Sequence, residues 1–467
     1  MNLRSILFIV FSFCLMKSFG QQANYKFNNF GNRSILLSGN VTGSVTDLGL
    51  VYYNPSRLTE VENTGFAFNA RAYQLSSLKL SNFLGEDSRV SSTNFNGIPS
   101  MAGGTFDLFG NRFAYSFISK TRTDNTIGYD IETLSDNVFE SYPDAYNYKG
   151  NVLLRTLIRD DWFGLTWAKK VNNKFSLGFS LFGSAYNYNG GSNLNHTINF
   201  ETSKVAFYQN TIGFRQESYG LILKIGANYH FERFDLGLNI NLPYLEIYQK
   251  GRFTYTKVVA GSDLGLDQFY DYNLKNLASK RKEPLGISLG AGIPINKSKL
   301  HLNMDYVSGI KRYNRMNIPN IDTGQDELTT VLFKEYRRNV FNFGAGFELY
   351  INETFKSYVS FSSDYNGFIE NANIFDLSSD GNRDITVGED FIHYSVGVDF
   401  KLPWASIILG TTYTSGSTEF ISPSNIIPIE DDFEYETTTI DYSRWQFVVG
   451  IEIPVFDKIN PLNKSEK

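Results

Sequence analysis

The chain has 467 residues and a formal net charge of −5, with 43 Lys and Arg against 48 Asp and Glu, and 16% of it is aromatic. Its basic residues are scattered and form no basic run, which argues against a nucleic-acid-binding protein. The single cysteine, Cys14, is expected to leave with a signal peptide, so a disulfide framework and a thiolate metal site are both excluded.

Residues 1–20 have the features of a secretory signal peptide. Arg4 precedes the apolar run ILFIVFSFCLM at 6–16, and Gly20 is a small residue at a suitable cleavage point. The run is too short to cross a bilayer as a helix. The alternatives are a buried N-terminal helix and a lipobox around Cys14, which lies inside the apolar run. We therefore expect export of the mature chain.

Residues 21–62 lack strand-like alternation and are rich in turn-forming residues, as in NNFGNRSILLSGNVTGSVTDLGLVYYNPSRL. If the strands that follow close into a barrel, this segment is expected to occupy the lumen as a plug, because the lumen would otherwise be an open channel. The first apolar anchors of the plug are candidates for gating it: Tyr25, Phe27 and Phe30.

From residue 63 to 456 the chain repeats a strand, a tight turn, a second strand and a long polar loop. Strand-like segments begin near residues 64, 99, 111, 158, 174, 213, 233, 283, 299, 338, 354, 390, 404 and 442. The loops between alternate pairs run for roughly 20–35 residues, which is rare in a soluble domain. Short periplasmic turns and long external loops are typical of membrane barrels.

The strand faces support the same interpretation. Near the end of the chain, Phe447 and Val449 share one face, while Arg444 and Gln446 share the other. A soluble β-sandwich also alternates, but the number and length of the strands favour a barrel. Aromatic residues near strand ends are expected in interfacial girdles: Trp162, Trp167, Trp404, Tyr413 and Trp445. We predict an all-β fold, a 14-stranded antiparallel transmembrane β-barrel with a lumenal plug, and a periplasmic tail at 457–467.

Two loops carry apolar residues at helical spacing, over 131–142 and 264–277. Short amphipathic helices there could roof the barrel mouth and offer an apolar groove. The candidate groove residues are Leu266, Phe269, Tyr270 and Leu274. The alternative is that such loop helices only pack against each other.

Catalytic and metal chemistry find no support. The four histidines share no metal-ligand spacing, and no G-x-S-x-G motif is present. His301 and His393 fall on the inward face, near Asn303, Asp305 and Asp399, where we expect a polar network in the lumen; the alternative is a lumenal His–Asp pair. We expect no enzymatic activity, no cofactor and no metal.

Part of the N-terminal segment resembles the hatch of the FadL/TodX family of outer-membrane transporters of hydrophobic compounds. The resemblance is carried by Asn29-Phe30 with Gly31, Arg33 and Ser34, by Leu37-Ser38-Gly39, and by the stretch 52–58, where Ser56 replaces the Ala of the family's Asn-Pro-Ala motif. It implies 14 strands and a hatch motif made of Arg33, Tyr53, Asn54 and Pro55, with Asn54 satisfying backbone groups inside the plug. The alternative for Asn54-Pro55 is an ordinary turn before a strand.

The resemblance implies passive uptake of a hydrophobic small molecule, such as a long-chain fatty acid or an aromatic, across the outer membrane of a Gram-negative bacterium. The expected partners are that ligand, membrane lipid and lipopolysaccharide, and no nucleic acid. The alternative is a barrel component of a protein secretion or surface-assembly system, whose partners would be secretion-machinery proteins.

Overall fold

The computed structural model describes residues 24–61, 64–81, 89–109, 111–132, 144–261, 267–369, 372–384, 390–423 and 435–454. The expected signal peptide, 1–20, and the expected tail, 457–467, lie outside these residues. No helix in the described ranges is long and apolar enough to cross a membrane.

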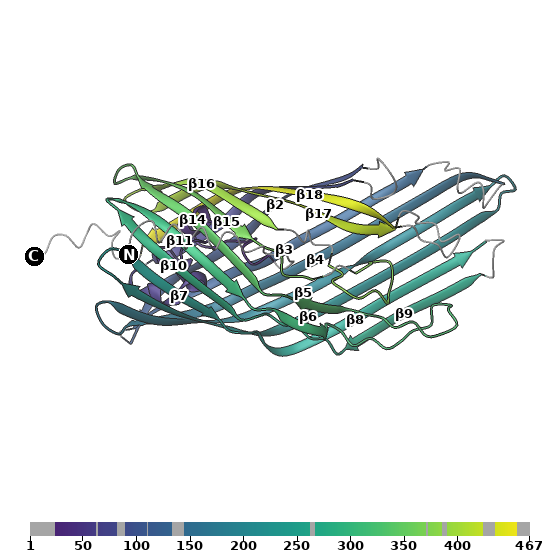
Figure 1. Cartoon of the computed structure of the whole chain (residues 1–467), viewed down its shortest axis with the longest axis horizontal. Coiled ribbons are helices and arrows are strands. Elements are labelled where there is room, and N and C mark those ends of the chain that lie inside the picture. The colour runs from purple at the N-terminus through teal and green to yellow at the C-terminus, as the bar shows by residue number, and fades with distance from the viewer. Residues whose placement is uncertain are drawn as a thin grey trace, which may run out of the picture.

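The strands close into a barrel (Figure 1). Fourteen antiparallel strands form it, as predicted, and the first pairs with the last. They are β1 (Thr64–Ser81), β2 (Arg89–Leu108), β3 (Asn111–Glu132), β4 (Ala145–Lys170), β5 (Phe175–Phe200), β6 (Val205–His230), β7 (Asp235–Asn241), β10 (Gly286–Ile295), β11 (Ser298–Val307), β14 (Val340–Tyr350), β15 (Phe355–Asp364), β16 (Phe391–Lys401), β17 (Ser406–Pro423) and β18 (Tyr435–Pro454). A separate two-stranded sheet pairs β12 (Ile310–Asn314) with β13 (Lys334–Arg337).

The barrel has walls of unequal height. Strands β4, β5 and β6 each have 26 residues, whereas β10, β11 and β15 each have 10. Two further strands, β8 (Leu245–Ala260) and β9 (Gln268–Leu277), extend the sheet. Strand β8 pairs with residues 207–221 of β6, and β9 pairs with β8. We call β4, β5, β6, β8 and β9 the tall wall; Figure 1 shows it projecting to the right, away from the end where the N label lies.

Three of the long loops predicted from the sequence are wrong, because strands of the tall wall occupy most of them. Much of 122–157, 189–212 and 250–282 is strand, and only 201–204 connect β5 to β6. The helix predicted over 264–277 is wrong, because 268–277 form β9. The helix predicted over 131–142 falls mostly outside the described residues. Hydrophobic alternation fades in these stretches because their outward face is polar, while the ladder hydrogen bonds to neighbouring strands continue.

The predicted strand faces are confirmed. Trp445, Phe447 and Val449 point outward, with 44%, 51% and 43% of their surface exposed, whereas Arg444 and Gln446 are buried inside. One aromatic was misassigned: the expected girdle residue Trp162 points inward and is only 4% exposed. Its ring packs against Phe182 and Tyr52.

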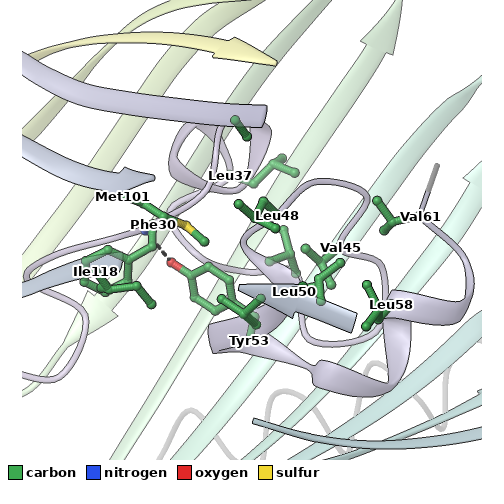
Figure 2. Close-up of a cluster of buried hydrophobic side chains, with 14 of the residues drawn as sticks. Phe30, Leu37, Val45, Leu48, Leu50, Tyr53, Leu58, Val61, Met101 and Ile118 are labelled. Carbon is green, nitrogen blue, oxygen red and sulfur yellow. Dashed lines mark hydrogen bonds between the residues drawn. The ribbon is translucent and has the colours of Figure 1, made fainter. Parts of the chain in front are cut away.

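Residues 24–61, which we call the N-terminal segment, lie inside the ring of strands. They contain α2 (Arg33–Leu36), α3 (Leu50–Tyr53) and the 3-10 helix η1 (Pro55–Thr59). Helix η1 contacts β3 to β6, and α2 contacts β15 to β17, so the segment touches opposite arcs of the wall. Its apolar side chains form the main core together with Met101 and Ile118 of the wall (Figure 2).

Glycines on the inward face of the wall allow this close packing. A Cβ atom at Gly226 would collide with the Asn54 side chain, and one at Gly237 would collide with the backbone at Thr42. The backbone of the N-terminal segment therefore lies directly against the strands.

Candidate functional site

A cavity of about 310 Å³ lies inside the barrel, bounded on one side by the N-terminal segment. We call it the chamber. Its floor is formed by residues 24–29 with Tyr52 and Tyr53, and strands β1, β3, β4, β5 and β6 contribute its walls. Further lining residues come from the segments 310–337 and 372–384, which we call the roof. Apolar residues of the roof pack against the inward face of the tall wall, which fixes the roof in place: Met316, Ile321, Val331, Phe333 and Leu377.

Two lysines meet at the floor of the chamber. The Nζ atoms of Lys120 and Lys224 lie 5.3 Å and 4.0 Å from the centre of the Tyr52 ring. Lys224 is buried, and neither lysine forms an ion pair with a carboxylate among the residues that the structure describes. The face of an aromatic ring compensates only part of a buried positive charge. The pair is therefore suited to bind an anionic group that enters the chamber.

The charges of four other residues that line the chamber, by contrast, are compensated: Asp160, Arg281, Glu283 and Arg337. Arg281 pairs with Asp160 at 2.7 Å and with Glu283 at 3.0 Å, and Arg337 lies 3.7 Å from Glu283. Burial alone would raise the pKa of the Glu283 carboxyl, but the charges of Arg281 and Arg337 outweigh this effect and lower it. Burial raises the pKa of Tyr25, beside Arg337, to about 12, so its hydroxyl stays neutral.

The wall of the barrel splits beside the chamber. Strands β2 and β3 pair only from Leu108↔Asn111 to Met101↔Ile118. Beyond that point the described part of β2 pairs only with β1, and the described part of β3 pairs only with β4. Two local features explain the split: Pro99 has no N–H to donate to a ladder, and β3 carries an irregularity between Ser119 and Thr121.

The chamber reaches this split, because residues 120–125 of β3 line it. Gln74 and Ser76 of β1, on the other side of β2, line it as well. A molecule in the chamber thus lies next to a gap across which the described parts of β2 and β3 share no ladder hydrogen bonds.

The four residues of the family-type motif anchor the N-terminal segment. Arg33 bonds Asp399 of β16 at 2.8 Å and lies 3.3 Å from Glu452 of β18. The Tyr53 hydroxyl accepts a hydrogen bond from the Phe30 backbone N–H at 3.0 Å (Figure 2). The Asn54 side chain bonds backbone groups of both the segment and β6, and Pro55 begins η1.

The three gating candidates do not form one group. Tyr25 and Phe27 line the chamber. The Phe27 ring packs against Phe391 at 5.4 Å between centroids, and the Arg444 guanidinium lies 3.6 Å from its centre. Phe30 belongs instead to the buried core, with none of its surface exposed (Figure 2).

The predicted external groove residues are also separated. Tyr270 and Leu274 pack against the cluster that holds the roof, whereas Phe269 points to the opposite face of β9 and is 70% exposed. Leu266 lies outside the described residues. Tyr270 and Leu274 face the lumen because β9 is a strand, so the groove proposed from helical spacing does not form from these residues.

The charged residues of the chamber were missed by the sequence analysis. Lys120 and Lys224 are single basic residues at lumen-facing positions of strands with alternating faces. A lysine at such a position was the only feature of the sequence that could have predicted them. Arg281 and Glu283 were assigned to an external loop or its edge. The two inward histidines do belong to polar networks: His301 bonds Ser44 at 2.6 Å, and His393 lies 3.1 Å from a carboxylate oxygen of Asp364.

Several solved structures are similar to this chain over most of their length. A Pseudomonas aeruginosa FadL homologue matches with a TM-score of 0.53 and 12% identity, over 92% of this chain and 100% of that one. The P. putida toluene transporter TodX matches with a TM-score of 0.55 and 10% identity, over 91% and 99%. The Ralstonia pickettii toluene transporter TbuX matches with a TM-score of 0.54 and 12% identity, over 91% and 98%.

No protein-family model and no curated protein sequence matches the chain. The similarity of the solved structures shows that it has the FadL/TodX-family fold.

Proposed function

We propose that the protein is an outer-membrane channel of a Gram-negative bacterium for the passive uptake of hydrophobic small molecules, such as long-chain fatty acids or aromatics. The observation that carries this proposal is a lumenal chamber beside a split in the barrel wall. Two of the proteins with a similar fold are toluene transporters, which supports a hydrophobic substrate.

The lining of the chamber suits an amphipathic ligand. Trp162, Ile158, Ile222 and Phe391 offer apolar surface, and burying apolar ligand surface contributes about 25 cal/mol per Å². The Lys120–Lys224 pair lies at the floor and would attract a carboxylate. A fatty acid would use both features, whereas a neutral aromatic would use only the first.

The split between β2 and β3 favours lateral release. Leaving through the floor would require the buried core around Phe30, Leu36 and Leu50 to separate. Leaving through the split breaks no ladder hydrogen bond, each of which contributes roughly 0.5–1.5 kcal/mol. In this scheme the N-terminal segment is a plug that closes the lumen, and Tyr25 and Phe27 adjust when a ligand occupies the chamber.

Tryptophan quenching tests binding directly. Trp162 is the only one of the four tryptophans that lines the chamber, so a brominated fatty acid bound there should quench its fluorescence. The Trp162→Phe variant should lose the quenching, and Lys120→Met with Lys224→Met should weaken binding of the acid but not of bromobenzene. If neither compound quenches Trp162, the uptake proposal fails, and co-purification of exported proteins would then favour the secretion role.

A disulfide staple tests the lateral route. Ser100 and Ser119 stand one position beyond the last β2–β3 pair, and the expected mature chain contains no other cysteine. Oxidised Ser100→Cys/Ser119→Cys should lose fatty acid uptake into liposomes, keep Trp162 quenching and recover on reduction. Thr105→Cys/Ala114→Cys, inside the existing ladder, is the matched control. Full uptake by the stapled variant would instead favour release through the lumen.

A further inference from the structure

The outward face of the tall wall changes character along its strands. Towards the short turns it is apolar: Phe163 and Leu165 of β4 are 61% and 48% exposed, and Phe179 and Leu181 of β5 are 42% and 43% exposed. The outward positions of β5 from 175 to 185 are apolar or glycine, which matches the roughly 9–11 residues that a tilted strand needs to cross a bilayer. From Asn187 onwards the outward positions of β5 are polar or glycine.

Basic residues gather where this change occurs. We call a row of directly paired residues across neighbouring strands a rung. The first polar rung consists of Arg159 of β4, Asn187 of β5, Glu217 of β6 and Lys250 of β8. The rungs that follow add further outward basic residues. We call these residues the basic band: Arg155, Arg159, Arg215, Lys250, Arg252 and Lys275.

The register sets like charges directly opposite each other. Arg122 of β3 is paired with Arg159, and Arg215 is paired with Arg252. Like charges at directly paired positions destabilise a sheet. Glu217, which lies 2.9 Å from Arg215, offsets part of this repulsion.

Most of the band lacks such compensation. The side chains of Arg155, Arg159, Lys250 and Lys275 make no hydrogen bond or ion pair with any residue that the structure describes, and all four are exposed. Neighbouring strands lie about 4.8 Å apart, so Arg159 and Lys250, three strands apart, flank a surface roughly 14 Å wide. This surface is suited to bind anions larger than a single ion.

Beyond the band, amides and hydroxyls fill most outward positions of β5, and β4 and β6 add others beside residues such as Leu153 and Lys149. They form a continuous patch across three strands: Asn151, Asn193, Asn195, Gln209 and Thr211. Such groups can donate and accept hydrogen bonds with sugar hydroxyls. The face thus presents in succession an apolar zone, a cationic zone and a zone rich in amides and hydroxyls.

We infer that the basic band binds the phosphorylated glycolipid of the outer leaflet. Its acyl chains would lie against the apolar zone, its phosphates against Arg155, Arg159 and Lys250, and its sugars against the amide patch. Arginine binds phosphate oxygens through two parallel N–H donors, which explains its prevalence in the band. This inference goes beyond the proposed transport function, because no residue of the band lines the chamber.

Lipid A binding tests the inference on the full-length protein in detergent. The variant carries Arg155→Gln, Arg159→Gln, Lys250→Gln and Lys275→Gln, and the control carries Lys169→Gln and Lys401→Gln, exposed residues near the short-turn end. Native mass spectrometry measures binding of diphosphorylated lipid A, dephosphorylated lipid A and phosphatidylglycerol. We expect the wild type and the control to bind the diphosphorylated form, and the variant to bind it at least about tenfold more weakly.

Three outcomes would overturn the inference: equal binding by the variant, equal binding of the dephosphorylated form, or equal binding of phosphatidylglycerol, which would make the site a general anion surface. Heat-modifiable gel mobility shows that the variant barrel is folded. Quenching of Trp162 by the brominated fatty acid should be unchanged in the variant, so failure here and failure of the transport proposal are distinguishable.

Discussion

Replacing Asn54 by alanine is expected to loosen the N-terminal segment while the barrel stays folded. The Asn54 side chain is fully buried. It donates to the carbonyl oxygens of Thr42 at 2.7 Å and Ala227 at 3.1 Å, and it accepts from the N–H and the hydroxyl of Ser56 at 3.2 and 2.7 Å. At roughly 0.5–1.5 kcal/mol for each hydrogen bond, the loss comes to about 2–6 kcal/mol. Because 1.4 kcal/mol is a tenfold change, even the lower figure raises the undocked population roughly 30-fold.

Hydrogen exchange followed by mass spectrometry measures this loosening. Peptides from the N-terminal segment should exchange faster in Asn54→Ala, while peptides from β14 to β16 and the heat-modifiable gel mobility should not change. Asn54→Asp should behave similarly, because it keeps the two accepted hydrogen bonds but turns an anion towards two carbonyl oxygens. Gly226→Ala, whose Cβ atom would strike the Asn54 side chain, should act in the same direction. Wild-type exchange rates in Asn54→Ala would refute the assignment of Asn54 as the anchor.

Phe27→Ala removes a ring whose burial is worth at most about 1.5–3 kcal/mol. Planar-bilayer conductance should therefore rise while the barrel stays folded, and unchanged conductance would argue against a gating role. Val449→Arg should destabilise the barrel by roughly 2–4 kcal/mol in vesicle refolding, whereas a similar loss in Val449→Leu would mean that the face is misassigned. An epitope tag in the turn at 296–297 should be hidden on intact cells and one at 201–204 should be labelled; the reverse pattern would invert the topology. Burial would raise the pKa of Glu283, but its arginine partners lower it. Its carboxylate therefore stabilises the roof above its unfolded pKa and loses that effect as the pH falls through the folded value. Exchange of roof amides should rise at acidic pH in the wild type and show less pH dependence in Glu283→Gln.

The number of strands and their faces could be predicted because apolar outward positions alternate with small or polar inward ones. On β18, for example, Phe447 and Val449 alternate with Gln446 and Gly450. The extra height of β5 could not be predicted in this way. Beyond Asn187 its outward positions are polar, so the hydrophobic period disappears while the backbone pairing persists. The full length of β5 depends on its pairing with equally long neighbouring strands, and the sequence of a single strand does not show such pairing.

The error in β9 has a different cause. Tyr270 and Leu274 are four positions apart, a spacing that places two residues on one face of a helix and equally on one face of a strand. Pairing with β8 decides between the two. The chamber was missed for a related reason, because Lys120 and Lys224 belong to no local motif and meet only when distant strands and the N-terminal segment come together.

The path of the N-terminal segment constrains the order of folding. The segment runs directly into β1, yet its final partners come from the other end of the chain: Ser38 bonds Ser395, and Phe27 bonds Arg444 across 417 positions. These contacts cannot form until the last strands exist, and the pairing of β1 with β18 then encloses the segment. Contacts between such distant positions form slowly. Residues near the start of the expected mature chain are therefore among the last to reach their native contacts, and they must lie inside the ring when it closes.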